Sequence, residues 1–107
     1  MKKILFDQGT PVPLRHSFPS HQVYTAYELG WDKLSNGDLI SMAEQNDFDL
    51  LITTDQNLRY QQNLLSRKIS ILVLQTTSWP RIQKSLDLVV LTVSATESVS
   101  YTELNVP

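Results

Sequence analysis

The chain of 107 residues has no cysteine, only three glycines and no long apolar run. Without cysteine it forms neither disulfides nor thiolate zinc sites. The three glycines are scattered, which excludes a glycine-rich loop around a phosphate group. No apolar run approaches the roughly 18 residues of a membrane-spanning helix, and Asp7 interrupts the apolar start too early for a signal peptide. These absences predict a cytoplasmic protein, and the length predicts a single domain over residues 1–107.

The charge balance is close to even, with 9 basic and 11 acidic side chains and a net charge of −2. This balance neither favours nor excludes nucleic acid, because a nuclease needs only a local basic path to its site. His16 and His21 lie on either side of a proline turn, so they do not form a helical metal-binding pair. Composition alone therefore leaves the function open.

Apolar runs alternate with helical patterns along the chain. The runs predict buried strands at Lys3–Phe6, His21–Ala26, Leu50–Thr54 and Ile69–Leu74. Helices are predicted to begin at Pro11–Pro13, at Asn36–Asp38 and at Trp79–Pro80, and to cover Asn57–Ser66. The alternation predicts a small three-layer α/β fold with a mostly parallel central sheet.

Finer expectations concern which residues face the sheet and how the chain ends. In the segment after Pro11, the spacing of Val12, Leu14 and Phe18 predicts that all three side chains face the sheet. The segments Leu91–Val93 and Val99–Leu104 are rich in β-branched residues, which predicts edge strands or a dimer contact. The last residues are expected to be loosely held.

Two of the predicted buried strands are followed by an aspartate, Asp7 after the first and Asp55 after Leu50–Thr54. Ligands of open α/β sheets bind outside the carboxyl ends of the strands, so we expect these side chains to share one site. Neighbouring carboxylates repel each other, and Mg²⁺ or Mn²⁺ removes that penalty by accepting their oxygens. The alternative is that each aspartate only caps the helix that follows it.

Other polar residues are weaker candidates. Asp38 and Glu28 are further acids, although Asp38 has a sufficient explanation in the dipole of the helix it begins. Arg59 and Arg67 are candidates for contacts with phosphates and Tyr60 for stacking on a base, against the alternative of a solvated helix face.

Several segments together resemble the small bacterial PIN-like family, which is similar to the PIN-domain ribonucleases and is commonly paired with a small antitoxin protein. The resemblance covers Met1 to about Ile82, and its most specific part is the block Phe48–Leu64. Further matching segments are Ile4–Gln8, Glu28–Trp31, Asn36–Ile40 and Ala43–Glu44.

The resemblance implies a parallel sheet flanked by helices, with acids around Mg²⁺ or Mn²⁺, and metal-dependent hydrolysis of RNA phosphodiesters. It implies Asp7 and Asp55 as catalytic metal ligands, with Asp38 as the third acid and Glu28 as a fourth ligand. Relatives often carry an aspartate where this chain has Asn36. Residues two apart on a helix differ by roughly 200°, so Asp38 and Asn36 do not reach the same point of a regular helix.

The resemblance also implies a small antitoxin as a partner, and the short chain suggests that a second copy completes the substrate groove. Two alternatives stay open. One is a PIN-like domain that has lost catalysis and acts as a protein-interaction module. The other is a phosphate-accepting receiver-like domain, which would need a lysine at the end of its last strand, where this chain has Gln75, Thr76 and Thr77.

Overall fold

The computed structural model describes residues 1–58, 67–96 and 99–107. Five parallel strands form one sheet in the order β2-β1-β3-β4-β5. The strands are β1 (Lys3–Phe6), β2 (Gln22–Thr25), β3 (Leu50–Thr53), β4 (Ser70–Leu74) and β5 (Tyr101–Leu104). The predicted α/β class is confirmed, and all described strand pairs are parallel.

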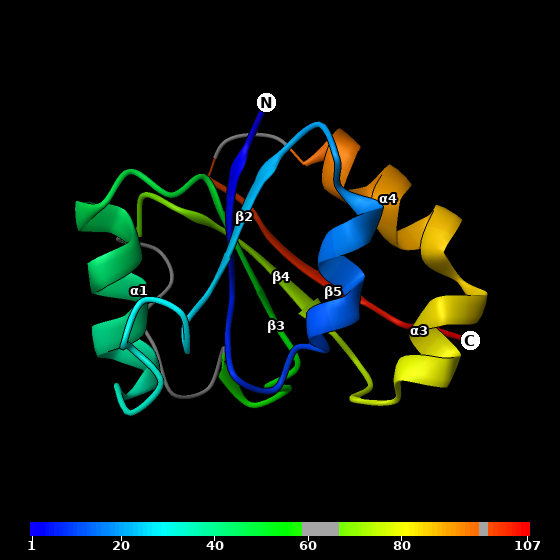
Figure 1. The fold of residues 1–107 in the computed structure, drawn as a ribbon, viewed down its shortest axis with the longest axis horizontal. Helices are drawn as coiled ribbons and strands as arrows, with labels where there is room; N and C mark the ends of the chain where they lie inside the picture. The colour runs from blue at the N-terminus through cyan, green and yellow to red at the C-terminus, as the bar shows by residue number, and fades with distance from the viewer. Residues whose placement is uncertain (59–66, 97–98) are drawn as a thin grey trace.

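Helices cover both faces of the sheet (Figure 1). The α-helix α1 (Asn36–Gln45) packs on one face. The 3₁₀ helix η1 (Val12–Ser17) and the helices α3 (Trp79–Lys84) and α4 (Leu86–Ala95) lie on the other. Ser35 caps α1 by accepting a hydrogen bond from the Asp38 N–H, which fixes where this helix begins.

Each face of the sheet has its own apolar core, because alternate residues of a strand point to opposite sides. Ile4 and Phe6 of β1 belong to the core under η1, α3 and α4, whereas Leu5 belongs to the core under α1. The three inner strands β1, β3 and β4 are therefore buried on both faces, which explains why they appear in the sequence as nearly continuous apolar runs, whereas the outer strands β2 and β5 are more polar.

Three of the finer predictions were wrong. Leu91–Val93 lies in helix α4, where Val89 and Val93 are one turn apart and both fully buried. The helical spacing of these buried residues outweighs their preference for strands. Val12 is about half exposed, while Leu14 and Phe18 face the core as predicted. The chain end is not loose, because Val106 is buried and its carbonyl accepts a hydrogen bond from Arg81 at 2.6 Å.

The predicted strand at Val99–Leu104 is confirmed as edge strand β5. Most of the predicted helix Asn57–Ser66 lies outside the described residues. In the part of the chain that is described, no helix is both long and apolar enough to cross a membrane.

Candidate functional site

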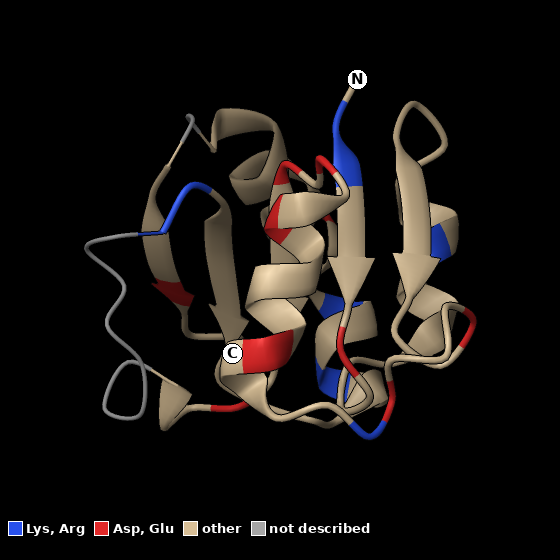
Figure 2. Cartoon of the chain, turned by 90° about the vertical axis from the view of Figure 1, so that its left-hand side faces the viewer, with Lys and Arg blue, Asp and Glu red and all other residues tan. Residues whose placement is uncertain are grey.

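The candidate site lies where the strand order changes direction. The chain goes from β1 outward to β2 and then returns to β3 on the opposite side of β1. In doubly wound sheets, this switch point leaves a crevice outside the carboxyl ends of the two strands, and ligands bind there. Asp7 follows β1 and Asp55 follows β3, so the fold brings both acids to the carboxyl edge of these two neighbouring strands. Figure 2 shows acidic segments beyond the strand arrowheads along the lower edge of that view.

Asp7 is placed by the sheet itself. Phe6 is in register with Ile52, and the Asp7 N–H still donates to the Ile52 carbonyl at 3.2 Å. The parallel ladder thus continues one residue beyond β1 and sets Asp7 beside Thr53. This position is a consequence of register, because shifting a strand by one residue would turn its side chains to the opposite face.

Hydroxyl and amide donors surround the Asp7 carboxylate. Its Oδ1 accepts from the Thr10 hydroxyl at 2.7 Å and from the Thr10 N–H at 3.1 Å, and its Oδ2 accepts from the Thr53 hydroxyl. Burial raises the pKa of Asp7 above its ordinary value of 3.8, and these hydrogen bonds oppose the increase. No lysine or arginine among the described residues forms an ion pair with Asp7. The negative charge of this carboxylate is therefore balanced only in part, by the dipoles of uncharged hydroxyl and N–H groups.

Thr53 connects the two acids. Its hydroxyl donates to Asp7 and accepts from the backbone N–H of Asp55 at 3.1 Å, and its side chain is almost fully buried. The Asp55 carboxylate accepts from the Asn57 N–H at 3.0 Å through Oδ1 and from the Asn36 side-chain amide at 2.7 Å through Oδ2. The first turn of α1 therefore reaches the second acid through Asn36.

Asp7 lies between two hollows. A small one of about 120 Å³ is bordered by Trp31, Asp32 and Asn36, so it separates the strand ends from α1. A larger one of about 350 Å³ lies on the η1 side and is bordered by Arg15, Tyr27 and Glu28. The same partly buried carboxylate is thus reached from both sides of the sheet edge.

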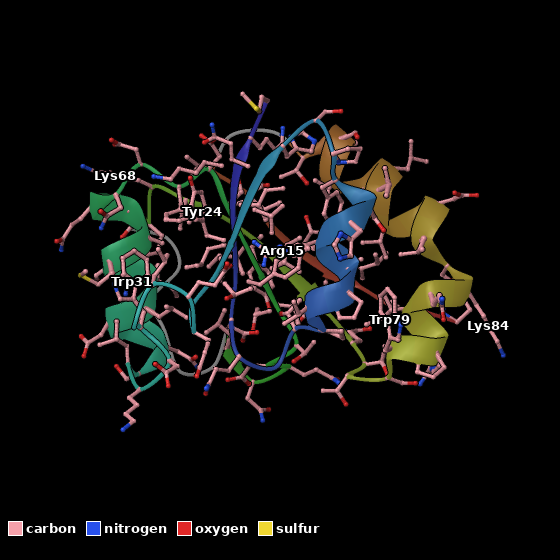
Figure 3. All side chains as sticks on the ribbon, in the orientation of Figure 1. Arg15, Tyr24, Trp31, Lys68, Trp79 and Lys84 are labelled. Atoms are coloured by element: carbon pink, nitrogen blue, oxygen red, sulfur yellow. The ribbon has the colours of Figure 1, made fainter. Side chains whose placement is uncertain are left out.

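Glu28 is bound to its own turn and to η1. Its Oε1 accepts from the Thr25 N–H at 2.9 Å and forms an ion pair with Arg15 at 3.0 Å. The Thr25 hydroxyl in turn accepts from the Glu28 N–H at 3.1 Å. These hydrogen bonds, first the one from the Thr25 backbone and then the one from Arg15, lower the pKa of Glu28. Figure 3 shows Arg15 extending from η1 toward the strands.

The other predicted site residues lie apart from the acids or outside the described residues. Asp38 is exposed in the first turn of α1 and, like Asp55, borders neither hollow, but it has no contact with either acid. Arg67 precedes β4, at the amino edge of the sheet, and forms an ion pair with Glu44 at 3.2 Å. It also donates to the Ser41 hydroxyl, so it joins β4 to α1 instead of facing the acids. Arg59 and Tyr60 fall outside the described residues.

The oxygen atoms that could serve as metal ligands at the crevice suit a hard cation only in part. Within residues 1–58, 67–96 and 99–107, no group of three or more histidine, cysteine, aspartate or glutamate side chains is arranged to hold a metal. Mg²⁺, however, commonly binds through one or two carboxylates and completes its shell with waters and substrate phosphates. Asp7 and Asp55 supply that minimum, and the partly buried Asp7 carboxylate, whose pKa is raised, is the kind of group that a cation stabilises. The residues are therefore better suited to an ion that also binds waters and a substrate phosphate than to an ion held by protein ligands alone.

Sequence reasoning missed Arg15, Asp32 and the contact between Asn36 and Asp55. Arg15 and Glu28 are 13 positions apart, and nothing in the local pattern indicates that they pair. Asp32 borders the smaller hollow but follows an irregular turn that carries no periodic signal. Asn36 was predicted to begin a helix and, through the resemblance, to stand where relatives carry an aspartate, but nothing in the sequence indicated that its amide contacts Asp55.

Comparisons with protein-family models, with curated proteins and with solved structures found no match for this chain.

Proposed function

We propose that this protein is a metal-dependent ribonuclease of the PIN-like kind, which hydrolyses RNA phosphodiesters at the β1–β3 crevice. The observation that carries the proposal is the pair of acids, Asp7 and Asp55, at the switch point of the sheet and joined through Thr53. The resemblance of the sequence motifs to the PIN-like family adds the substrate class. A small antitoxin protein as partner follows from the same resemblance, and so does a second copy that completes the groove.

The side chains of the site have different roles in this reaction. Asp7 and Asp55 would hold Mg²⁺ or Mn²⁺ at the strand ends. When bound, such an ion supplies an activated water and neutralises the charge that develops on the phosphate. Thr53 and Thr10 fix the orientation of the Asp7 carboxylate, and Asn36 fixes that of Asp55. No side chain serves as a nucleophile in this scheme.

Asn36 takes the place that the resemblance gave to a third acid. Its amide already touches Asp55, whereas Asp38 is exposed on another side of α1. The proposal therefore gives the third position to Asn36 and leaves Asp38 at the helix start, where its charge favours the helix dipole. Because Asn36 carries no charge, the site has two carboxylates instead of three, and the repulsion between them before a cation binds is weaker.

The test is cleavage of a mixed pool of folded and single-stranded RNA by the purified protein, with Mn²⁺ or Mg²⁺ and with EDTA. We expect metal-dependent cleavage that is lost in Asp55→Asn and retained in Asp38→Asn. Asp87→Asn, an exposed acid in the first turn of α4, is the matched control and should leave cleavage unchanged. Equal loss in Asp38→Asn and Asp55→Asn would contradict the assignment of Asn36.

A catalytically silent interaction module is the second candidate. It is favoured by the Asn36 amide on Asp55 and by the lack of a three-acid cluster in the described part of the chain. Absence of cleavage across the pool, together with no rise in melting temperature on adding Mn²⁺, would select this alternative. The receiver-like alternative gains no support, because the last strand is β5, which ends at Leu104 and is followed by Asn105 and not by a lysine.

A further inference from the structure

The larger hollow beside Asp7 has features of a binding pocket for one planar polar molecule. Its volume of about 350 Å³ lies within the usual range for small-molecule sites. It combines exposed apolar side chains with a charged pair, and it shares Asp7 with the crevice of the proposed ribonuclease. A group in this pocket would therefore lie next to the phosphate held at the acids.

Glu28 offers the pocket an unused acceptor. Its Oε1 is taken by the Thr25 N–H and by Arg15, while Oε2 makes no hydrogen bond or ion pair to any described residue. The side chain is about half exposed, so this oxygen is open to a ligand. An ionised carboxylate only accepts hydrogen bonds, which selects ligands that present N–H groups.

Arg15 offers complementary donors. Its Nη2 donates to the Val23 carbonyl at 2.9 Å and pairs with Glu28, which holds the planar group in place. Within the described residues, Nη1 and Nε of Arg15 have no partner. A guanidinium fixed in this way recognises a molecule that carries acceptor atoms in one plane.

Tyr27 and Val12 supply the apolar part. Tyr27 is 75% exposed and Val12 is 51% exposed, although both border the pocket. Tyr27 is held in a tight turn that ends at Gly30, whose φ of +74° suits glycine. An exposed tyrosine in a rigid turn is a stacking surface for a flat ring, and aromatic stacking is the usual way in which proteins hold an unpaired base.

We propose that this pocket binds a guanine base of the RNA strand, next to the phosphate at the acids. Guanine presents two N–H groups side by side on its Watson–Crick edge, which match the open Oε2 of the Glu28 carboxylate, and the neighbouring acceptor O6, which matches a free N–H group of Arg15. Uracil has a single ring N–H and no amino group, and adenine and cytosine lack paired donors of this kind. Glu28 is thereby a base-reading residue and not a metal ligand. The inference rests on the proposed function for its substrate, and it is tested by binding without cleavage.

The experiment measures binding by fluorescence anisotropy of labelled oligouridine strands that carry one guanosine, one adenosine, one cytidine or no substitution. The measurements use EDTA in one series and Ca²⁺ in another, so that binding is followed without Mg²⁺- or Mn²⁺-dependent cleavage. We expect the strand with guanosine to bind about tenfold more tightly than oligouridine. Glu28→Gln should reduce this preference to about twofold or less, because it replaces an ionised acceptor by a neutral amide, which forms weaker hydrogen bonds with N–H donors.

The stacking surface is tested by Tyr27→Ala, which should weaken binding of all strands by about tenfold, while Tyr27→Phe keeps the ring and the affinity. Leu91→Ala removes another exposed apolar side chain, on α4, and should change nothing. Equal affinity of wild type for all four strands, or an unchanged preference in Glu28→Gln, would overturn the proposal.

The same protein is then titrated with guanosine monophosphate and uridine monophosphate, following the melting temperature. Binding of guanosine monophosphate without a guanosine preference among the strands would assign the pocket to a free nucleotide and overturn the RNA assignment. These results are independent of cleavage. A guanine preference without any RNA cleavage would refute the ribonuclease and keep the pocket, whereas cleavage without base preference would do the reverse.

Discussion

Replacing Thr53 by valine tests the connection between the two acids most directly. Valine has nearly the same shape as threonine, so the buried position stays filled while the hydroxyl is removed. The substitution takes away a donor to the Asp7 carboxylate and an acceptor for the Asp55 N–H. No new charge or volume is introduced, which limits the change to these two hydrogen bonds.

The expected loss of stability follows from the two contacts. A hydrogen bond to a charged group contributes about 1.5–3 kcal/mol, and an unsatisfied buried donor costs about 1–3 kcal/mol. Asp55 is only half-buried, so water compensates part of the second loss. We therefore expect Thr53→Val to lower the free energy of unfolding by about 2–4 kcal/mol at pH 7. Thr53→Ser keeps the hydroxyl and should lose only about 1 kcal/mol, for one methyl group.

The assay is urea unfolding followed by circular dichroism, with EDTA present. The same pair of variants is then measured in an Asp7→Asn background, where the lost contact joins two neutral groups. In that background, the loss of unfolding free energy caused by Thr53→Val should be smaller by about 1 kcal/mol. This difference is the coupling energy between the two side chains. Equal costs for the valine and serine variants, or no coupling with Asp7, would refute the assignment of Thr53 as the connecting residue.

Two further predictions concern the same edge of the sheet. Burial raises the folded-state pKa of Asp7 above 3.8, so between that value and the raised pKa the folded protein binds more protons than the unfolded chain. In EDTA, wild-type stability should therefore fall as the pH rises through this window. The isosteric variant Asp7→Asn should lack this fall and be the more stable protein at pH 7; parallel pH profiles from urea unfolding would contradict this. Separately, a Cβ on Gly9 would lie 2.5 Å from the Thr54 hydroxyl oxygen, so Gly9→Ala should lower stability by about 1–3 kcal/mol. Thr54→Ala should recover part of that loss in the double variant, and simple additivity of the two single effects would show that the contact does not cause it.

The sequence determined the layers of this fold because its three inner strands are buried on both faces. Such strands appear as unbroken apolar runs, and β1, β3 and β4 were predicted within one residue of their observed bounds. The same argument failed at Leu91–Val93, where β-branched residues form part of a buried helix. The composition of this segment predicted a strand, but packing against the sheet favoured a helix, and such packing cannot be seen in composition.

The sequence also indicated the pair of strand-end acids, since a polar residue directly after a buried strand must lie at its carboxyl end. Only the tertiary structure decided what surrounds them. The strand order placed β1 and β3 side by side, and the register set Asp7 against Thr53. Likewise, Glu28 was expected among the acids, but the approach of η1 to the turn after β2 paired it with Arg15. Contacts between segments far apart in the chain leave no periodic trace in the sequence, so their chemistry becomes visible only when the segments are packed together.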